Sequence, residues 1–177
     1  MSDLKLGLIS DSHFKPDIAR EAIEILKRKG AQILLHAGDI VELDTLLALR
    51  ESGLEYRAVL GNNDDELAKF KGEFKLFDEP YEFKFMDIKI ALMHHPKFLN
   101  IDANVVVFGH THSFGAIMKD GRLFVNPGEI CGRKFGKFSF MLLAYENQEF
   151  SAVRFSRSPN EGQWRKETIK ARLGFSA

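Results

Sequence analysis

The sequence predicts an α/β fold in which two β-sheets pack face to face, with helices on the outside. The first half alternates short apolar runs with amphipathic segments, which is the order of a parallel sheet with right-handed crossover helices. The second half is rich in strands, and the 16 phenylalanines suit the apolar filling between two sheets. A chain of 177 residues can bury one such core in a single domain.

Three strands and two helices are expected in the first half. Residues 6–9, 33–35 and 56–60 are short and almost wholly apolar, as buried parallel strands are. A helix begins at Pro16 and ends before Gly30, with apolar residues on one face. A second helix covers the leucines between 43 and 49 and ends before Gly53.

Two hairpins are expected in the next stretch. Residues 81–85 and 88–92 each alternate apolar with polar side chains, and Met86-Asp87 forms a tight connection between them. Residues 114–119 and 122–125 flank Asp120-Gly121, and both of these turn residues tolerate positive φ.

The C-terminal part differs from the rest of the chain. A last pair of strands, 138–145 and 149–156, closes the domain of residues 1–156. Residues 157–177 contain a cluster of helix and strand breakers and then a polar stretch, so we expect a surface tail of the same domain, helical around 163–172. Trp164 and Phe175 are the side chains expected to dock this tail, on the domain or on another subunit.

Composition narrows the class of protein. Equal numbers of basic and acidic residues, 25 each, give a net charge of +0, which argues against a dedicated nucleic-acid binder. Cys131 is the single cysteine and cannot close an intramolecular disulfide, which favours a reducing compartment. With no secretory leader and no apolar stretch long enough to cross a membrane, we expect a cytoplasmic protein.

Potential metal ligands follow five apolar runs. Because ligands collect beyond the carboxyl ends of parallel strands, these side chains are expected to meet at one place. Three of them come directly after a glycine, where a tight turn or a close approach to an ion is expected. The residues are Asp11 and His13 after the first run, Asp39, Asn62 and His110 after glycines, His94-His95 after the run ending at Met93, and His112.

The chemistry of this set points to two metal ions. Asp11 and His13 are two apart on a segment expected to be extended, so both side chains leave one face, roughly 6–7 Å apart. His110 and His112 repeat the spacing. Carboxylate, imidazole and amide groups without thiolate suit Mn, Fe, Zn, Ni or Co better than Ca.

The order of these motifs resembles the calcineurin-like metallophosphoesterase superfamily, and within it the small, uncapped bacterial and archaeal phosphodiesterases. The resemblance covers residues 4 to 156. The matching positions are Asp11-x-His13, Gly38-Asp39, Gly61-Asn62-Asn63-Asp64, His94 and Gly109-His110-Thr111-His112. It implies a four-layer α-β-β-α sandwich of two mixed sheets flanked by helices, in agreement with the two sheets predicted above.

The resemblance also implies roles for the residues. One metal would be held by Asp11, His13, Asp39 and His112, and the other by Asp39, Asn62, His94 and His110. Asp39 would bridge the two ions, and a metal-bridging hydroxide would attack phosphorus; Asp39, Asn62, His94 and His110 are counted as catalytic. Two divalent ions are implied, with Mn favoured over Ni, Zn, Fe, Co or Mg.

One position departs from the family pattern. The third motif usually reads Gly-Asn-His, and that histidine contacts phosphate and protonates the leaving group. Here the position is Asn63, although the acidic partner Asp64 is present. His95 is the candidate replacement. His36 is weighed as a packed or supporting histidine, and Arg133 with Lys134 as phosphate contacts or as part of a solvated loop.

Two other functions remain open. A non-catalytic scaffold that binds partner proteins, as the retromer subunit of this fold does, has no need for all seven ligand positions, yet here all seven hold ligand types. A DNA-end nuclease would need a cap and a basic groove. We therefore expect a phosphodiesterase that acts on a small phosphodiester, without membrane attachment and without nucleic-acid binding; a homo-oligomer is left open.

Overall fold

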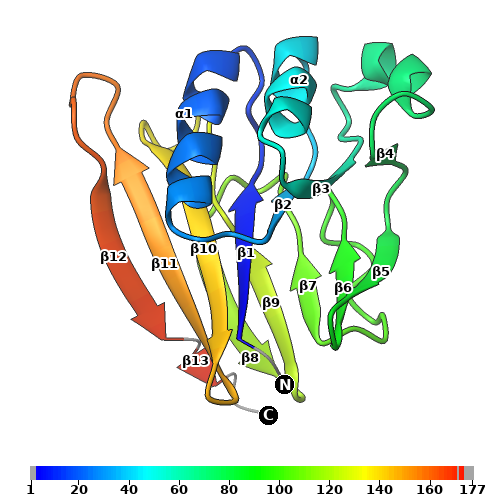
Figure 1. Ribbon diagram of the computed structural model, residues 1–177, viewed down its shortest axis with the longest axis vertical. Coiled ribbons are helices and arrows are strands. Elements are labelled where there is room, and N and C mark those ends of the chain that lie inside the picture. Colours follow the sequence, from blue (N-terminus) through cyan, green and yellow to red (C-terminus); the bar gives the residue numbers. More distant parts are fainter. Residues whose placement is uncertain (1–2, 171, 174–177) are drawn as a thin grey trace.

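Two β-sheets lie face to face in the computed structural model, which describes residues 3–170 and 172–173 (Figure 1). The larger sheet has the strand order β12-β11-β10-β1-β2-β3-β4, and the smaller has β13-β8-β9-β7-β6-β5. The larger sheet comprises β1 (Leu4–Ile9), β2 (Ile33–His36), β3 (Glu55–Val59), β4 (Leu76–Phe77), β10 (Phe138–Glu146), β11 (Glu149–Arg157) and β12 (Arg165–Lys170). The smaller sheet comprises β5 (Tyr81–Phe85), β6 (Ile88–Leu92), β7 (Val105–Val107), β8 (Gly115–Lys119), β9 (Arg122–Asn126) and β13 (Arg172–Leu173).

The strand directions bring several loops to one end of the sandwich. Strands β1 to β4 run parallel to one another, and so do β6, β7 and β9, while the remaining pairs other than β13–β8 are antiparallel. Figure 1 shows the arrowheads of β1, β6, β7 and β9 pointing toward the same end of the molecule. The loops that carry the predicted ligands follow these parallel strands. Both sheets are therefore mixed, as predicted.

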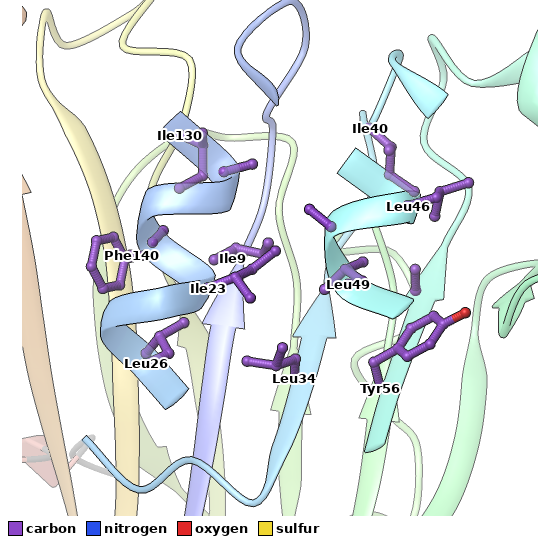
Figure 2. Packing of buried hydrophobic residues seen from close by; sticks show 14 of the residues in the cluster. Ile9, Ile23, Leu26, Leu34, Ile40, Leu46, Leu49, Tyr56, Ile130 and Phe140 are labelled. Atoms are coloured by element: carbon purple, nitrogen blue, oxygen red, sulfur yellow. The ribbon is translucent and has the colours of Figure 1, made fainter. Parts of the chain in front are cut away.

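Two helices cover the outer face of the larger sheet (Figure 2). Helix α1 (Pro16–Arg28) starts at the predicted proline, and helix α2 (Leu43–Glu51) covers the predicted leucines; a 3₁₀ helix, η1, follows at Asp65–Phe70. Ile23 and Leu26 of α1 pack with Ile9 and Leu34 of the sheet, and all four side chains are almost fully buried. Each such burial stabilises the fold by about 1.5–3 kcal/mol, so this layer fixes both helices on the sheet.

A second apolar layer fills the space between the sheets. Alternate residues of β1, such as Leu6 and Leu8, face Ile90 of β6 and Val107 of β7 across this space. The remaining face of the smaller sheet carries a third cluster, in which the segment between Met93 and Ala103 packs on the outward side chains of β6 and β7. The phenylalanines expected between the sheets are divided among all three apolar clusters, and Phe14, Phe98 and Phe135 are exposed, so the expectation holds for only part of them.

The helix expected around residues 163–172 is wrong, because residues 165–170 form strand β12. This strand pairs with β11 in the antiparallel direction and forms an edge of the larger sheet. The exposed charged side chains along β12 are typical of an edge strand. The segment is a strand because its backbone pairs with β11, although its polar sequence lacks the alternation of a strand.

Trp164 docks the C-terminal segment on the domain, as predicted. Its indole ring lies 4.8 Å from the Phe140 ring, and Nε1 donates a hydrogen bond of 2.7 Å to Glu21. Phe175 lies outside the described residues, and the boundary at residue 156 stays a prediction. Within residues 3–170 and 172–173, none of the helices has the length and apolar character needed to cross a membrane.

Candidate metal centre

The structure brings Asp11, His13 and His112 together beyond the ends of β1 and β7. Asp11 Oδ1 lies 3.2 Å from His112 Nε2 and 4.0 Å from His13 Nε2. The three donor atoms of this group lie within 4.8 Å of one another. Loops about a hundred positions apart in the sequence thus form one cluster, as predicted for the first metal.

A second group surrounds His94, which follows β6. His94 Nε2 lies 3.0 Å from Asn62 Oδ1, 3.2 Å from His110 Nδ1 and 3.5 Å from Asp39 Oδ2. These are the four residues predicted for the second metal.

Asp39 lies between the two groups. Its Oδ2 atom is 3.5 Å from His13 Nε2 and also 3.5 Å from His94 Nε2. A single carboxylate oxygen therefore contacts one histidine of each group. This is the position that a bridging ligand requires.

Several nitrogen and oxygen atoms of the centre face one another at short distance, as ligands around a cation do. His94 Nδ1 lies 2.8 Å from the carbonyl oxygen of Ala37, which fixes the ring proton on Nδ1 and leaves a lone pair on Nε2. His13 Nε2 is buried without a hydrogen-bond partner among the described residues, while Asp11 Oδ1 faces His112 Nε2 at 3.2 Å. Unpaired donors of this kind are costly unless a cation completes them. The nitrogen and oxygen donor set fits divalent transition metals.

The electrostatics of the centre favour positive charge. The contact with Asp11, reinforced by Cys131 and Glu129, raises the pKa of His112 to about 11. Burial lowers the pKa of His94, but Asp39 and Asp11 outweigh burial, and the net effect raises it. Burial raises the pKa of the Asp39 carboxyl. The contact with His94 and two hydrogen bonds from Asn63 lower it by more than burial raises it, so the pKa lies below the usual range. A carboxylate with so low a pKa, such as that of Asp39, pairs with protonated histidines or with a metal ion.

The backbone of the ligand loops is left-handed at five of the seven predicted positions. The residues with positive φ are Asp11, His13, Asp39, His110 and His112, with φ values between 42° and 62°. The extended conformation expected for residues 11–13 and 110–112 is therefore wrong. Left-handed backbone costs on the order of 1 kcal/mol or more for a residue with a side chain, and such strain collects at functional sites.

Glycines before the ligands allow the loops to approach one another. A Cβ atom on Gly61 would lie 2.3 Å from the backbone nitrogen of Asp39, and one on Gly109 would lie 2.1 Å from Ser10 Oγ. Neither contact is sterically possible. These glycines therefore allow a close approach between loops, and the approach to an ion expected from the sequence stays a prediction.

Comparison with known proteins places this geometry in a family. The family model described as the calcineurin-like phosphoesterase superfamily domain matches residues 4–148. The chain belongs to the calcineurin-like phosphoesterase superfamily. The resemblance seen in the sequence and the enzyme class, a phosphoester hydrolase, are thereby confirmed.

Relatives of this superfamily include a phosphodiesterase from Methanocaldococcus jannaschii, which is 29% identical over 163 residues, 85% of this chain and 98% of its own. A solved structure described as a novel archaeal phosphodiesterase is also 29% identical, with a TM-score of 0.76 over 85% of this chain and 99% of that one. A Vps29 from Entamoeba histolytica in complex with Zn²⁺ has a TM-score of 0.73 at 22% identity, over 94% of this chain and 99% of that one, which shows the shared fold alone.

Glu129 and Glu79, which were not predicted from the sequence, orient histidines at the candidate centre. Glu129, which is 1% exposed, accepts a hydrogen bond from His112 Nδ1 and so directs Nε2 toward Asp11. Glu79 accepts the backbone N–H groups of His94 and His95 and lies 2.5 Å from His95 Nδ1. Glu129 directly follows Asn126-Pro127-Gly128, and its place beside that turn was the one available signal.

Asn63 and Asp64 have roles that differ from the family pattern. Asn63 donates through its backbone N–H and its Nδ2 to the two oxygens of Asp39, at 3.0 and 2.9 Å. Asp64 is buried and accepts the backbone N–H groups of Ile40, Val41 and Gly61. The amide at position 63 thus holds the predicted bridging carboxylate in place.

His36, Arg133 and Lys134 are the remaining residues that the sequence raised. Lys134 is exposed, and its Nζ donates a hydrogen bond of 3.2 Å to the carbonyl oxygen of Thr111. His36 is fully buried and bonds to Ser12 Oγ and to the N–H of Gly38, and burial lowers its pKa to about 3. It is a neutral, supporting histidine under the Asp39 loop. Arg133 Nη1 lies 3.2 Å from His13 Nδ1, at the edge of the centre.

Proposed function

We propose that the chain is a metal-dependent phosphodiesterase with a binuclear centre. The observation that carries this proposal is that the seven predicted ligand residues form two groups joined by Asp39, whose Oδ2 atom lies 3.5 Å from a histidine of each group. The name of the archaeal relative supports a diester substrate. Asp11, His13, Asp39 and His112 would hold one ion, and Asp39, Asn62, His94 and His110 the other.

In the proposed reaction one water molecule is added across a P–O ester bond, which gives a phosphomonoester and an alcohol. Two divalent ions held by these ligands would supply the activated water as nucleophile and neutralise charge on the phosphoryl oxygens. Asn63 keeps both oxygens of Asp39 oriented through two hydrogen bonds. Arg133, beside His13, is placed to bind a phosphoryl oxygen.

The alcohol needs a proton when it leaves, and the amide of Asn63 cannot give one. His95 is the candidate donor, because its ring lies 4.4 Å from the His110 ring and its Nδ1 is held by Glu79. A carboxylate that orients an imidazole in this way is a common arrangement for proton transfer. The proposal is that His95 supplies the acid that the family usually places at position 63.

The second candidate is a non-catalytic scaffold, since Vps29 structures share the fold. Two features of the centre favour the enzyme. The left-handed backbone at the ligands stores strain that a scaffold would have no need to keep. The buried His13 Nε2 atom, which has no hydrogen-bond partner among the described residues, likewise serves no purpose in a partner-binding surface.

A metal-loaded activity assay tests the proposal. The full chain is saturated with Mn²⁺, its metal content is measured by elemental analysis, and hydrolysis of bis(p-nitrophenyl) phosphate is followed. We expect two ions per chain and turnover that Asp39→Ala abolishes. Asp102→Ala, at a side chain that is 90% exposed and paired only with Lys89, serves as the control. A folded chain that binds no metal, or Asp39→Ala with wild-type turnover, would refute the proposal.

The identity of the metal, the cellular location of the protein and the class of substrate belong to the same proposal. We favour Mn²⁺ among the transition metals that suit this donor set. Cys131 is free and buried, which supports a cytoplasmic location. A small phosphodiester is the proposed substrate; the neutral net charge speaks against nucleic acid.

A further inference from the structure

A cavity of about 190 Å³ opens beside His112 of the metal centre. His112 and Glu129 form the wall next to the centre, and Phe114, Phe135, Lys137 and Arg154 line the rest. Since one water occupies about 30 Å³ of liquid, the cavity has room for a group of several non-hydrogen atoms. It is therefore large enough for a short substituent of a substrate whose phosphate sits at the metals.

Arg154 is an unusual residue for this place. It belongs to β11, two residues after Ala152 of the inter-sheet core, so its side chain points into the space between the sheets. Its guanidinium lies 4.9 Å from the centre of the Phe114 ring, and its Nε is buried without a hydrogen-bond partner. A buried guanidinium N–H without an acceptor is costly, and stacking on an aromatic ring offsets only part of that cost.

Among the described residues, neither Arg154 nor Lys137 has a carboxylate within ion-pair distance, although Glu167 is the cross-strand neighbour of Arg154. Glu129 is already used, because it accepts hydrogen bonds from His112 and from the backbone N–H groups of Lys134 and Phe135. The cavity therefore offers two cationic groups to whatever enters it.

We propose that this cavity is a subsite for an ester arm that ends in an anionic group, a carboxylate or a second phosphate. The inference rests on the proposed phosphodiesterase function and narrows its substrate class to diesters with one such arm. Arg154 and Lys137 bind the anion. Phe135, whose side chain is 54% exposed at the cavity, covers the short carbon chain between the two charges.

The test compares phosphates that differ only at the far end of the arm. Propyl phosphate and 2-carboxyethyl phosphate, each with a homologue one methylene longer, are measured as inhibitors of bis(p-nitrophenyl) phosphate hydrolysis by the Mn²⁺-loaded full chain. Both members of a pair present the same phosphate to the metals, at the same free Mn²⁺ concentration. Calorimetry with the same compounds gives their affinities without turnover, so the subsite is tested even if the diester is not hydrolysed.

We expect the carboxylate compound to bind at least about tenfold more tightly, because a charge-assisted hydrogen bond in a partly buried site is worth that much. Arg154→Gln should bring this ratio close to one. Lys137→Gln, at an exposed residue where misfolding is no concern, should lower it too. Arg20→Gln is the matched control, since Arg20 lies on α1 and pairs with Glu51.

Two results would overturn the subsite. One is equal affinity for both compounds in the wild type, and the other is a preference that survives in both Arg154→Gln and Lys137→Gln, which would mean that Arg154 only stacks on Phe114. Absence of any diester hydrolysis, with a normal affinity ratio in calorimetry, would instead refute the proposed phosphodiesterase function.

Discussion

Glu129→Gln is the substitution that best tests how the metal centre is built. Glu129 is almost fully buried, and both of its oxygens are used. Oε1 accepts the N–H groups of Lys134 and Phe135 at 3.0 and 2.7 Å, and Oε2 accepts from His112 Nδ1 and from Cys131 Sγ. Glutamine has the same shape but replaces one acceptor with an N–H₂ donor. In either orientation, the amide N–H₂ group therefore faces an N–H donor, either that of His112 or those of Lys134 and Phe135.

The magnitude follows from that geometry. A buried donor left without its acceptor costs about 1–3 kcal/mol. If the amide keeps its oxygen toward the backbone, the cost falls on His112, whose Nε2 loses its fixed direction toward Asp11. With about 1.4 kcal/mol per factor of ten, the expected loss of Mn²⁺ affinity is about 10–100-fold, which is also the usual range for such partners of metal-binding histidines.

Calorimetric titration of Mn²⁺ into the wild type, Glu129→Gln and Glu51→Gln measures this loss. Glu51 is exposed and paired with Arg20 on the helices, so its variant controls for a change of charge. Thermal unfolding in the presence of a chelator separates the loss of folding stability from the loss of metal affinity. Mn²⁺ affinity of Glu129→Gln within twofold of the wild type would refute the view that Glu129 orients His112.

Three further predictions concern other parts of the chain. Because His95 is the proposed proton donor, Asn63→His should leave the ratio of alkyl to nitrophenyl diester hydrolysis unchanged in parallel kinetics on the two substrates. A selective rise of about tenfold for alkyl diesters would mean that His95 does not donate the proton. His94→Ala should lose more bound metal than His95→Ala in elemental analysis, since His94 contacts Asp39 and Asn62 directly; an equal or larger loss in His95→Ala would reverse the assignment. Trp164→Ala should lower the free energy of unfolding in urea by about 2 kcal/mol, below the range for a fully buried aromatic residue, because the ring is only half-buried; no change would mean that β12 holds without this contact.

Much of the fold was predictable because local patterns agreed with the final contacts. Helix α1 begins at the predicted proline, and both hairpins turn at the predicted residues, where Met86 and Asp120 have positive φ. Strand β12 was not predictable in this way. Its polar sequence carries no strand period, and it exists because β11 offers a free edge.

The seven proposed ligand residues could likewise be found from the sequence, but the geometry of their loops could not. Each ligand follows its own strand or glycine, so the residue types could be found one loop at a time. The left-handed backbone at Asp11 and His13 depends on hydrogen bonds to the loop of Asp39, from Asp11 N to the Gly38 oxygen and from His13 N to the Asp39 oxygen. Such bonds between loops are invisible to a local pattern.

The sequence by itself determined the two-sheet architecture, the helices of the larger sheet and the seven proposed ligand residues. These features could be predicted because periodicity, glycines and polar strand ends are local signals that span only a few residues. Only the tertiary structure decided which side chains support that centre. Glu129 reaches His112, Glu79 reaches His95, and Arg154 lies at the cavity beside the centre. These contacts join segments that are distant in the sequence and that the sheet topology brings together. Their energy comes from burial and charge in the folded protein, so no local sequence pattern reveals them.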